Sequence, residues 1–147
     1  MKRKDIINTI IDEQKKIVAN LEVSVERYEH ASDLDEDGTI DPDDLSQQTQ
    51  YRDMLLRFTQ LLDKAKKELE YLINETEEEH KIIEDGTLIE TDKAYIFIGI
   101  SVPKFNINDK VVYAISVEAP VYSKVKGKNI GDSIEFNQQE MKIISIA

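Results

Sequence analysis

Residues 33–45 read Asp-Leu-Asp-Glu-Asp-Gly-Thr-Ile-Asp-Pro-Asp-Asp-Leu, and a long helical pattern lies on each side of them. This stretch contains seven acidic residues and no basic one, in a chain whose formal net charge is −11. Asp41 is a good N-cap, and Pro42 suits the first position of a helix, where its missing N–H is no loss. We therefore predict that residues 33–45 form the acidic tip of a helical hairpin.

The apolar residues on both sides of the tip recur at alternating steps of three and four residues, which is the spacing of one helical face. Neither run contains glycine or proline. We expect helices over about 2–31 and 42–79 that fold back on each other as an antiparallel coiled coil. The first seam consists of Ile7, Ile10, Gln14, Ile17, Leu21, Ser24 and Tyr28, and the second of Tyr51, Leu55, Phe58, Leu62, Ala65, Leu69 and Leu72.

The apolar pattern changes after residues 74–80, Asn-Glu-Thr-Glu-Glu-Glu-His, which we interpret as a solvated stretch that forms either the end of the second helix or a hinge. Beyond them, short β-branched or aromatic runs alternate with Gly, Asn-Asp and Gly-Asp turn signals. The sequence therefore predicts an α+β protein, with a coiled-coil hairpin domain at 1–80 and a small antiparallel β domain at 81–147. The runs are 87–90, 94–101, 111–117, 133–136 and 141–146, with one short helical turn at 121–126.

Charge is distributed unevenly between the two halves of the chain. Residues 1–80 contain 21 acidic and 11 basic residues, whereas residues 81–147 contain nine and eight. An acidic first half would be repelled by a phosphate backbone, so we expect no direct binding to nucleic acid. Lys124, Lys126 and Lys128 form a small basic edge in the second half, for which an ordinary solvated turn is the alternative interpretation.

Residue types exclude several classes of site. The chain has no cysteine, which excludes disulfides, thiolate metal sites and cysteine nucleophiles. Only His30 and His80 can supply an imidazole. Asp5, Asn8 and Asp12 interrupt the apolar run near the amino terminus, so the sequence predicts neither a signal peptide nor a membrane span. We expect a cytoplasmic protein.

The tip has the ligand spacing of an EF-hand loop, with Gly38 at the sharp turn. Its last ligand is an aspartate rather than the longer glutamate, and no second loop pairs with it. EF-hand helices also cross steeply, whereas the two seams require near-antiparallel packing. Two interpretations stay open, an isolated Mg²⁺ or Ca²⁺ site and a solvated, capped turn. The candidate metal ligands are Asp33, Asp35, Asp37, Thr39, Asp41 and Asp44.

Two segments resemble the bacterial Gre transcript-cleavage factors. Residues 44–51, Asp-Leu-Ser-Gln-Gln-Thr-Gln-Tyr, are similar to the Asp-Leu-Ser-Glu-Asn-Ala-Glu-Tyr at the coiled-coil tip of that family. Ile115-Ser116, Ala119-Pro120 and residues 126–134, Lys-Gly-Lys-Asn-Ile-Gly-Asp-Ser-Ile, resemble the Ile-Ser…Ser-Pro…Gly-Lys-Lys-x-Gly-Asp signature of its carboxyl-terminal domain. Both matches occur in the family's order, and with the hairpin the resemblance covers nearly the whole chain.

This resemblance implies a fold and a function. In Gre factors an FKBP-like β domain docks at the rim of the RNA polymerase secondary channel, and the coiled coil enters that channel. The tip carboxylates help to hold the second Mg²⁺ of the polymerase active site, which activates water for cleavage of backtracked RNA. By this resemblance Asp41, Asp43 and Asp44 would assist the polymerase Mg²⁺. The docking residues would be Ser116, Ala119, Pro120, Gly127, Lys128, Gly131 and Asp132.

The resemblance further implies a monomer that is no enzyme by itself and meets nucleic acid only through the elongation complex. No tightly bound cofactor is expected, and Mg²⁺ or Ca²⁺ is expected only at the tip. The chain departs from the family at Gln47, which replaces a glutamate and supplies neither negative charge nor a base. The tip therefore either promotes cleavage through substitute acids or inhibits by occupying the metal site. A Ca²⁺-responsive binding module and a structural coiled-coil dimeriser are the alternatives from other classes.

Overall fold

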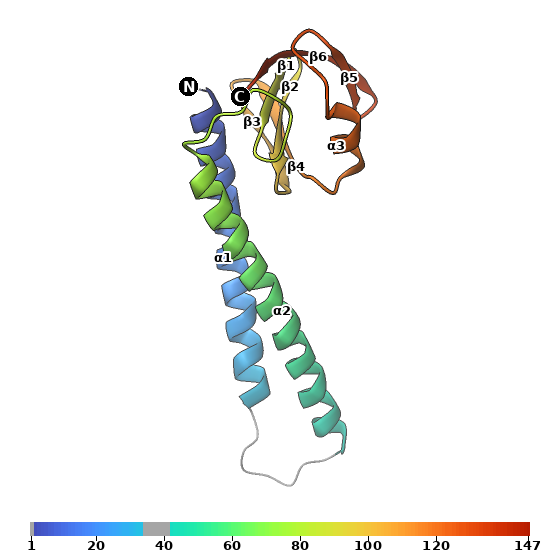
Figure 1. The fold of residues 1–147 in the computed structure, drawn as a ribbon. Coiled ribbons are helices and arrows are strands. Elements are labelled where there is room, and N and C mark those ends of the chain that lie inside the picture. The colour runs from blue at the N-terminus through green and yellow to red at the C-terminus, as the bar shows by residue number, and fades with distance from the viewer. Residues whose placement is uncertain (1, 34–41) are drawn as a thin grey trace. The chain divides into compact units, whose positions relative to one another are not determined.

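Two long antiparallel helices form the first half of the chain (Figure 1). The computed structural model describes residues 2–33 and 42–147. α1 spans Lys2–Asp33 and α2 spans Pro42–Glu75, so the predicted hairpin is confirmed, although α2 ends before the predicted residue 79. The last turn of α2 contains no basic residue, and three glutamates follow at 77–79. The negative end of the helix dipole disfavours acidic side chains there, which explains the earlier end.

Residues Gln14–Glu70 form one compact unit, which we call the hairpin shaft. Tyr28 of α1 stacks on Phe58 of α2, with ring centroids 5.3 Å apart. The predicted seam positions therefore do meet, and full burial of each large apolar side chain contributes about 1.5–3 kcal/mol. The packed residues of the shaft are Val18, Leu62 and Ala65, with Ile17, Leu21, Val25 and Leu69 against them.

No helix in either described range is long and apolar enough to cross a membrane.

The second half of the chain forms a six-stranded sheet with one short helix, in the strand order β3-β4-β2-β1-β6-β5. Five of the strands fall where the sequence predicts them. β3 was not predicted, because Pro103 and the exposed Lys104 interrupt its apolar pattern. The elements are β1 Leu88–Thr91, β2 Ala94–Gly99, β3 Val102–Ile107, β4 Lys110–Ser116, α3 Pro120–Val125, β5 Ser133–Phe136 and β6 Gln139–Ile146.

The sheet is mixed, and the prediction of a purely antiparallel β domain is wrong in this respect. β2 and β4 run parallel, in a register from Ala94↔Val111 to Gly99↔Ser116. The unpredicted β3 is the reason. It reverses the chain after β2, and a tight turn at Asn108 and Asp109, with φ 50° and 66°, reverses it again into β4. Because β4 enters the sheet between β2 and β3, it lies parallel to β2.

The sheet belongs to a second compact unit, the β unit, which consists of Met1–Glu13 and Tyr71–Ala147. The β unit therefore includes the start of α1 and the end of α2. Gly99 of β2 shows how closely α2 lies against the sheet, since an added Cβ there would be 2.7 Å from the Tyr71 hydroxyl. The predicted domain boundary between residues 80 and 81 stays a prediction. The deeply buried residues of the unit include Ile6, Ile7, Ile10 and Leu72 from the helices and Ile89, Ile96, Ile98, Met141 and Ile143 from the strands.

Candidate functional site

The predicted docking residues lie in one continuous segment, residues 116–132, which connects β4 to β5 through α3 (Figure 1). Ser116 begins it as a double acceptor: its carbonyl accepts the Ala119 N–H at 3.1 Å, and its Oγ accepts the Glu118 N–H at 3.3 Å. Ala119 is extended, with φ −66° and ψ 140°, and Pro120 then starts α3. Proline fits this position because the first N–H groups of a helix have no partner within it. Ser116, Ala119 and Pro120 thus build the entry to α3.

One buried side chain anchors α3 to the β unit. Val125 is 0% exposed and belongs to the same apolar core as Ile134 and Phe136. After it the Lys126 N–H donates to the Tyr122 carbonyl, and Gly127 follows with φ 85°. An added Cβ at Gly127 would meet nothing within 4 Å, so the positive φ alone requires glycine here.

A closed turn completes the segment. Asp132 accepts the Asn129 N–H on Oδ2 at 2.8 Å and donates its own N–H to the Asn129 carbonyl at 3.0 Å. Gly131, with φ 95°, donates its N–H to the Ile143 carbonyl at 2.9 Å and so joins the turn to β6. The Lys128 N–H bonds back to the Val125 carbonyl at 3.1 Å. Gly131 and Asp132 therefore fix the shape of the segment.

The exposed side chains of residues 116–132 include basic and apolar ones. Lys124, Lys126 and Lys128 are exposed, and Val117 and Ile130 are 38% and 63% exposed. Within the described ranges none of the three lysines forms an ion pair. The segment holds three lysines and two acidic residues, in a chain of net charge −11. It is therefore a local basic surface on an acidic protein.

The predicted tip residues are only partly described. Asp33 is the last residue of α1, and Asp43 and Asp44 lie in the first turn of α2. Gln47 is exposed. Among the side chains that the structure describes, which exclude those of Asp33, Asp43 and Asp44, no group of three or more His, Asp or Glu could hold a metal ion. The metal site and the assisting role of the acids remain predictions, because the structure does not describe Asp35, Asp37, Thr39 and Asp41.

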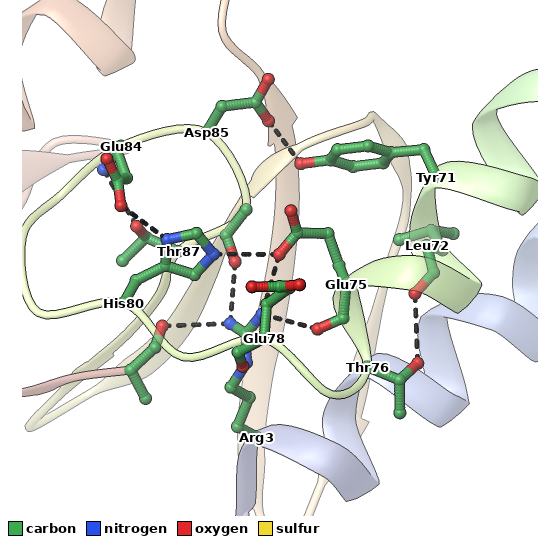
Figure 2. Close-up of polar contacts among 12 residues, drawn as sticks. Arg3, Tyr71, Leu72, Glu75, Thr76, Glu78, His80, Glu84, Asp85 and Thr87 are labelled. Atoms are coloured by element: carbon green, nitrogen blue, oxygen red, sulfur yellow. Dashed lines mark hydrogen bonds and ion pairs between the residues drawn. The ribbon is translucent and has the colours of Figure 1, made fainter.

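A buried polar cluster in the β unit was not predicted (Figure 2). Arg3 is 9% exposed, and its guanidinium donates five hydrogen bonds. Nε donates to the main-chain oxygen of Glu78 (2.8 Å), and Nη1 donates to the main-chain oxygens of Gly86 (2.7 Å) and Ala147 (3.0 Å). Nη2 donates to the main-chain oxygen (2.9 Å) and to Oε2 (3.1 Å) of Glu75. Burial lowers the pKa of Arg3, against the opposing effect of the Glu75 carboxylate. The cluster therefore connects the two stretches of sequence that make up the β unit, Met1–Glu13 and Tyr71–Ala147.

His80 extends this cluster. Its Nε2 lies 2.9 Å from Glu75 Oε2 and its Nδ1 lies 2.7 Å from Glu84 Oε1, so a protonated ring can donate to both carboxylates (Figure 2). Burial alone would lower the pKa of His80, but the hydrogen bonds to Glu84 and Glu75 raise it above 6.5. The interpretation of residues 74–80 as a solvated helix end is therefore wrong for Glu75 and His80, whose side chains are 15% and 11% exposed. No local spacing indicates this, because their partner Arg3 lies at the far end of the sequence.

A second contact secures α2 next to the cluster. The Tyr71 hydroxyl donates to Asp85 Oδ1 in a short hydrogen bond (Figure 2). Burial, followed by the hydrogen bond to Asp85, raises the pKa of Tyr71 far above its ordinary value. Tyr71 therefore stays protonated and acts as a donor at every physiological pH. These contacts give the cluster a structural role in holding residues 76–87 against the end of α2.

Comparisons with known proteins add one similarity. No protein-family model matches the sequence, and no curated protein matches it. Among solved structures, the chain is similar to the crystal structure of GreA factor homolog 1 (Gfh1) of Thermus thermophilus. The two sequences are 12% identical, the similarity covers 98% of this chain and 94% of that chain, and the TM-score is 0.35.

Proposed function

We propose that this chain regulates bacterial RNA polymerase, by docking through residues 116–132 and by presenting its hairpin tip to the secondary channel. One observation carries the proposal. The seven residues that the resemblance assigns to docking lie in a single hydrogen-bonded segment of the β unit, and exposed lysines lie among them. The second matching stretch, residues 44–51, belongs to the start of α2, where the hairpin carries its acids. Docking surface and tip are thus separate parts of the chain.

The basic surface favours a partner surface that is acidic. Lys124, Lys126 and Lys128 would face carboxylates of the polymerase, while Val117 and Ile130 would supply apolar contact. Charge pairs at the edge of such an interface mainly speed association and set specificity, and salt screens them. Binding to polymerase should therefore weaken as ionic strength rises.

The tip would act on the weakly held Mg²⁺ of the polymerase. Asp41, Asp43 and Asp44 would offer it anionic oxygen ligands, which Mg²⁺ prefers, while Gln47 offers only a neutral carbonyl. With one family carboxylate missing, we propose that the protein promotes cleavage weakly and acts mainly by occupying the channel. In this proposal the chemistry of RNA cleavage belongs to the polymerase, and the chain only modulates it.

Retention of RNA polymerase from the source organism on the immobilised full-length protein tests the proposal. A variant with Lys124→Glu, Lys126→Glu and Lys128→Glu should bind at least about tenfold more weakly, since each lost charge pair is worth up to about 1 kcal/mol and each new glutamate repels. The matched control carries Lys81→Glu, Lys104→Glu and Lys142→Glu, which change exposed lysines elsewhere in the β unit by the same total charge. No binding by the natural protein, or equal binding by both variants, would contradict the proposal.

Calorimetric titration of the free protein with Ca²⁺ and Mg²⁺ separates this function from the EF-hand alternative. The spacing of Asp33, Asp35 and Asp37 motivates that alternative. A sensor loop binds Ca²⁺ with a dissociation constant of about 10⁻⁷–10⁻⁵ M and much more weakly binds Mg²⁺. Such affinity without polymerase binding would replace the proposed function. Polymerase binding without tight Ca²⁺ binding supports it.

A further inference from the structure

Arg3 lies in the first turn of α1, yet its side chain bonds to segments that are remote from it in the sequence. Four of its acceptors are main-chain oxygens, those of Glu75, Glu78, Gly86 and Ala147, and the fifth is the Glu75 carboxylate. These groups belong to the end of α2, to residues 76–87, which we call the α2–β1 connection, and to the residue that follows β6. One guanidinium therefore links three segments of the β unit.

These acceptors depend on Arg3 because the site is largely closed to water. The Arg3 and Glu75 side chains are 9% and 15% exposed. A buried carbonyl that loses its donor keeps the cost of its desolvation, and a buried carboxylate that loses its cation keeps more. Lysine cannot replace the fork, because its donors radiate from one nitrogen and cannot reach acceptors on opposite sides. Arg3→Lys thus removes the forked arrangement of donors while it keeps the positive charge.

Lys4 provides a matched comparison in the same helical turn. Its Nζ lies 2.9 Å from Glu77 Oε1, so it also pairs with the α2–β1 connection. The two side chains are 57% and 76% exposed, and a pair in water contributes little to stability. Lys4→Ala therefore changes a neighbouring charge and a contact to the same segment without touching the buried cluster.

We propose that Arg3 is a strap that holds the α2–β1 connection closed. The first turn of α1 would then be required for the folded conformation of this part of the β unit. Without the guanidinium fork, the connection opens locally while the hairpin shaft stays folded. Local opening of this kind follows the loss of contacts that hold a segment, and Arg3 bonds to the connection at Glu78 and Gly86, beside the contacts made by His80 and Tyr71. The amino-terminal turn thereby controls the exposure of the buried residues of this connection, Ile83, Gly86 and Thr87.

Limited proteolysis of the full chain under native conditions tests the strap. Lys81 is the only lysine or arginine within 76–87, and it is exposed, so trypsin cleavage after Lys81 reports on this segment. When opening is fast relative to cleavage, the cleavage rate follows the population of the open form. Arg3→Lys should raise the rate at this bond by about tenfold or more, which is what the loss of one buried hydrogen bond predicts. Lys4→Ala should change it by less than about twofold.

Hydrogen exchange on the same proteins shows whether opening is local. The amides of Gly86 and Leu88, which bond to Ile98 and Ala147, should exchange faster in Arg3→Lys, while α2 amides of the hairpin shaft should not. Equal cleavage of Arg3→Lys and Lys4→Ala, or uniform loss of protection in both units, would overturn the proposal. If Arg3→Lys does not fold, Glu75→Gln keeps the shape and removes one charge. It should then raise cleavage after Lys81 by a smaller factor, and no increase would equally overturn the proposal.

Discussion

The Glu75 carboxylate lies where residue 86 would carry a side chain: its Oε2 is 2.5 Å from the position of a Cβ added to Gly86. Gly86 also has φ +94°, a conformation that other residues rarely adopt. Glycine is therefore required twice, for its backbone conformation and for the space that it leaves to Glu75. Arg3 and His80 hold the carboxylate there from two other directions.

We predict that Gly86→Ala lowers the free energy of unfolding by about 2–5 kcal/mol, because the strained backbone and the displaced carboxylate both contribute. Gly127→Ala is the matched control. It has φ +85° and nothing within 4 Å of an added Cβ, so only the backbone cost of about 1–2 kcal/mol applies. Urea denaturation measures both variants. Equal losses would show that the Glu75 carboxylate moves aside freely.

Stability should depend on pH through His80. Its pKa is raised in the folded protein, because the hydrogen bonds to Glu84 and Glu75 outweigh burial, which acts in the opposite direction. A raised folded pKa stabilises the protein below the unfolded value of about 6.5, and this contribution is lost as pH rises through the folded pKa. The free energy of unfolding should therefore fall as pH rises from about 6.5 through the folded pKa of His80.

The His80→Gln variant should lack most of this fall. His30→Gln, which changes an exposed histidine of α1, should keep it. Thermal denaturation of the three proteins at a series of pH values gives the comparison. A natural protein whose stability rises over this range would contradict the assignment of His80.

Gln14 should destabilise the hairpin shaft. It is 1% exposed, its Nε2 donates to the Ala65 carbonyl at 3.0 Å, and its Oε1 has no partner among the described residues. We predict that Gln14→Leu raises the free energy of unfolding by about 1–3 kcal/mol, since the unsatisfied acceptor disappears and apolar surface is buried. Gln60→Leu on the exposed face of α2 should change it by less than about 0.5 kcal/mol. Destabilisation by Gln14→Leu would mean that a buried water completes the amide's hydrogen bonds.

Cleavage of backtracked RNA should respond to the charge at position 47. Gln47 is exposed at the start of α2, so a glutamate fits there without repacking. We expect Gln47→Glu to raise cleavage by a stalled elongation complex about tenfold, because it returns an anionic oxygen to the proposed metal shell. Asp44→Asn should remove whatever activity the natural protein has. Strong cleavage that survives Asp44→Asn would exclude Asp44 as the principal ligand.

The acids at Asp33, Asp35 and Asp37 have two proposed roles, which their joint change to asparagine distinguishes. Loss of polymerase inhibition with unchanged cleavage would mark them as groups that block the channel. Loss of cleavage would mark them as substitute metal ligands. A variant with Glu22→Gln, Glu26→Gln and Glu29→Gln removes the same charge from α1 and should leave both activities unchanged.

Local patterns in the sequence determined the hairpin. Seam residues recur every three or four positions, so a short stretch of sequence is enough to show which face of each helix is apolar. The stacking of Tyr28 on Phe58 shows that these faces meet. Five of the six strands and α3 were also predicted, since turn residues bound them. The segment proposed for docking, residues 116–132, was singled out by its motif, whereas the structural roles of Gly131 and Asp132 are evident only from their hydrogen bonds.

Only the tertiary structure decided the parallel pairing of β2 with β4 and the cluster around Arg3. The parallel pair depends on β3, whose polar edge-strand sequence hides it from pattern analysis. The Arg3 and Ala147 groups that bond at 3.0 Å are separated by 144 positions. No periodicity relates such residues, and a charged side chain near a terminus is ordinarily solvated. The buried site forms only when the sheet packs against the helix ends. Arg3 and Glu75, which would be solvated charges in an unfolded chain, then bond to each other out of water.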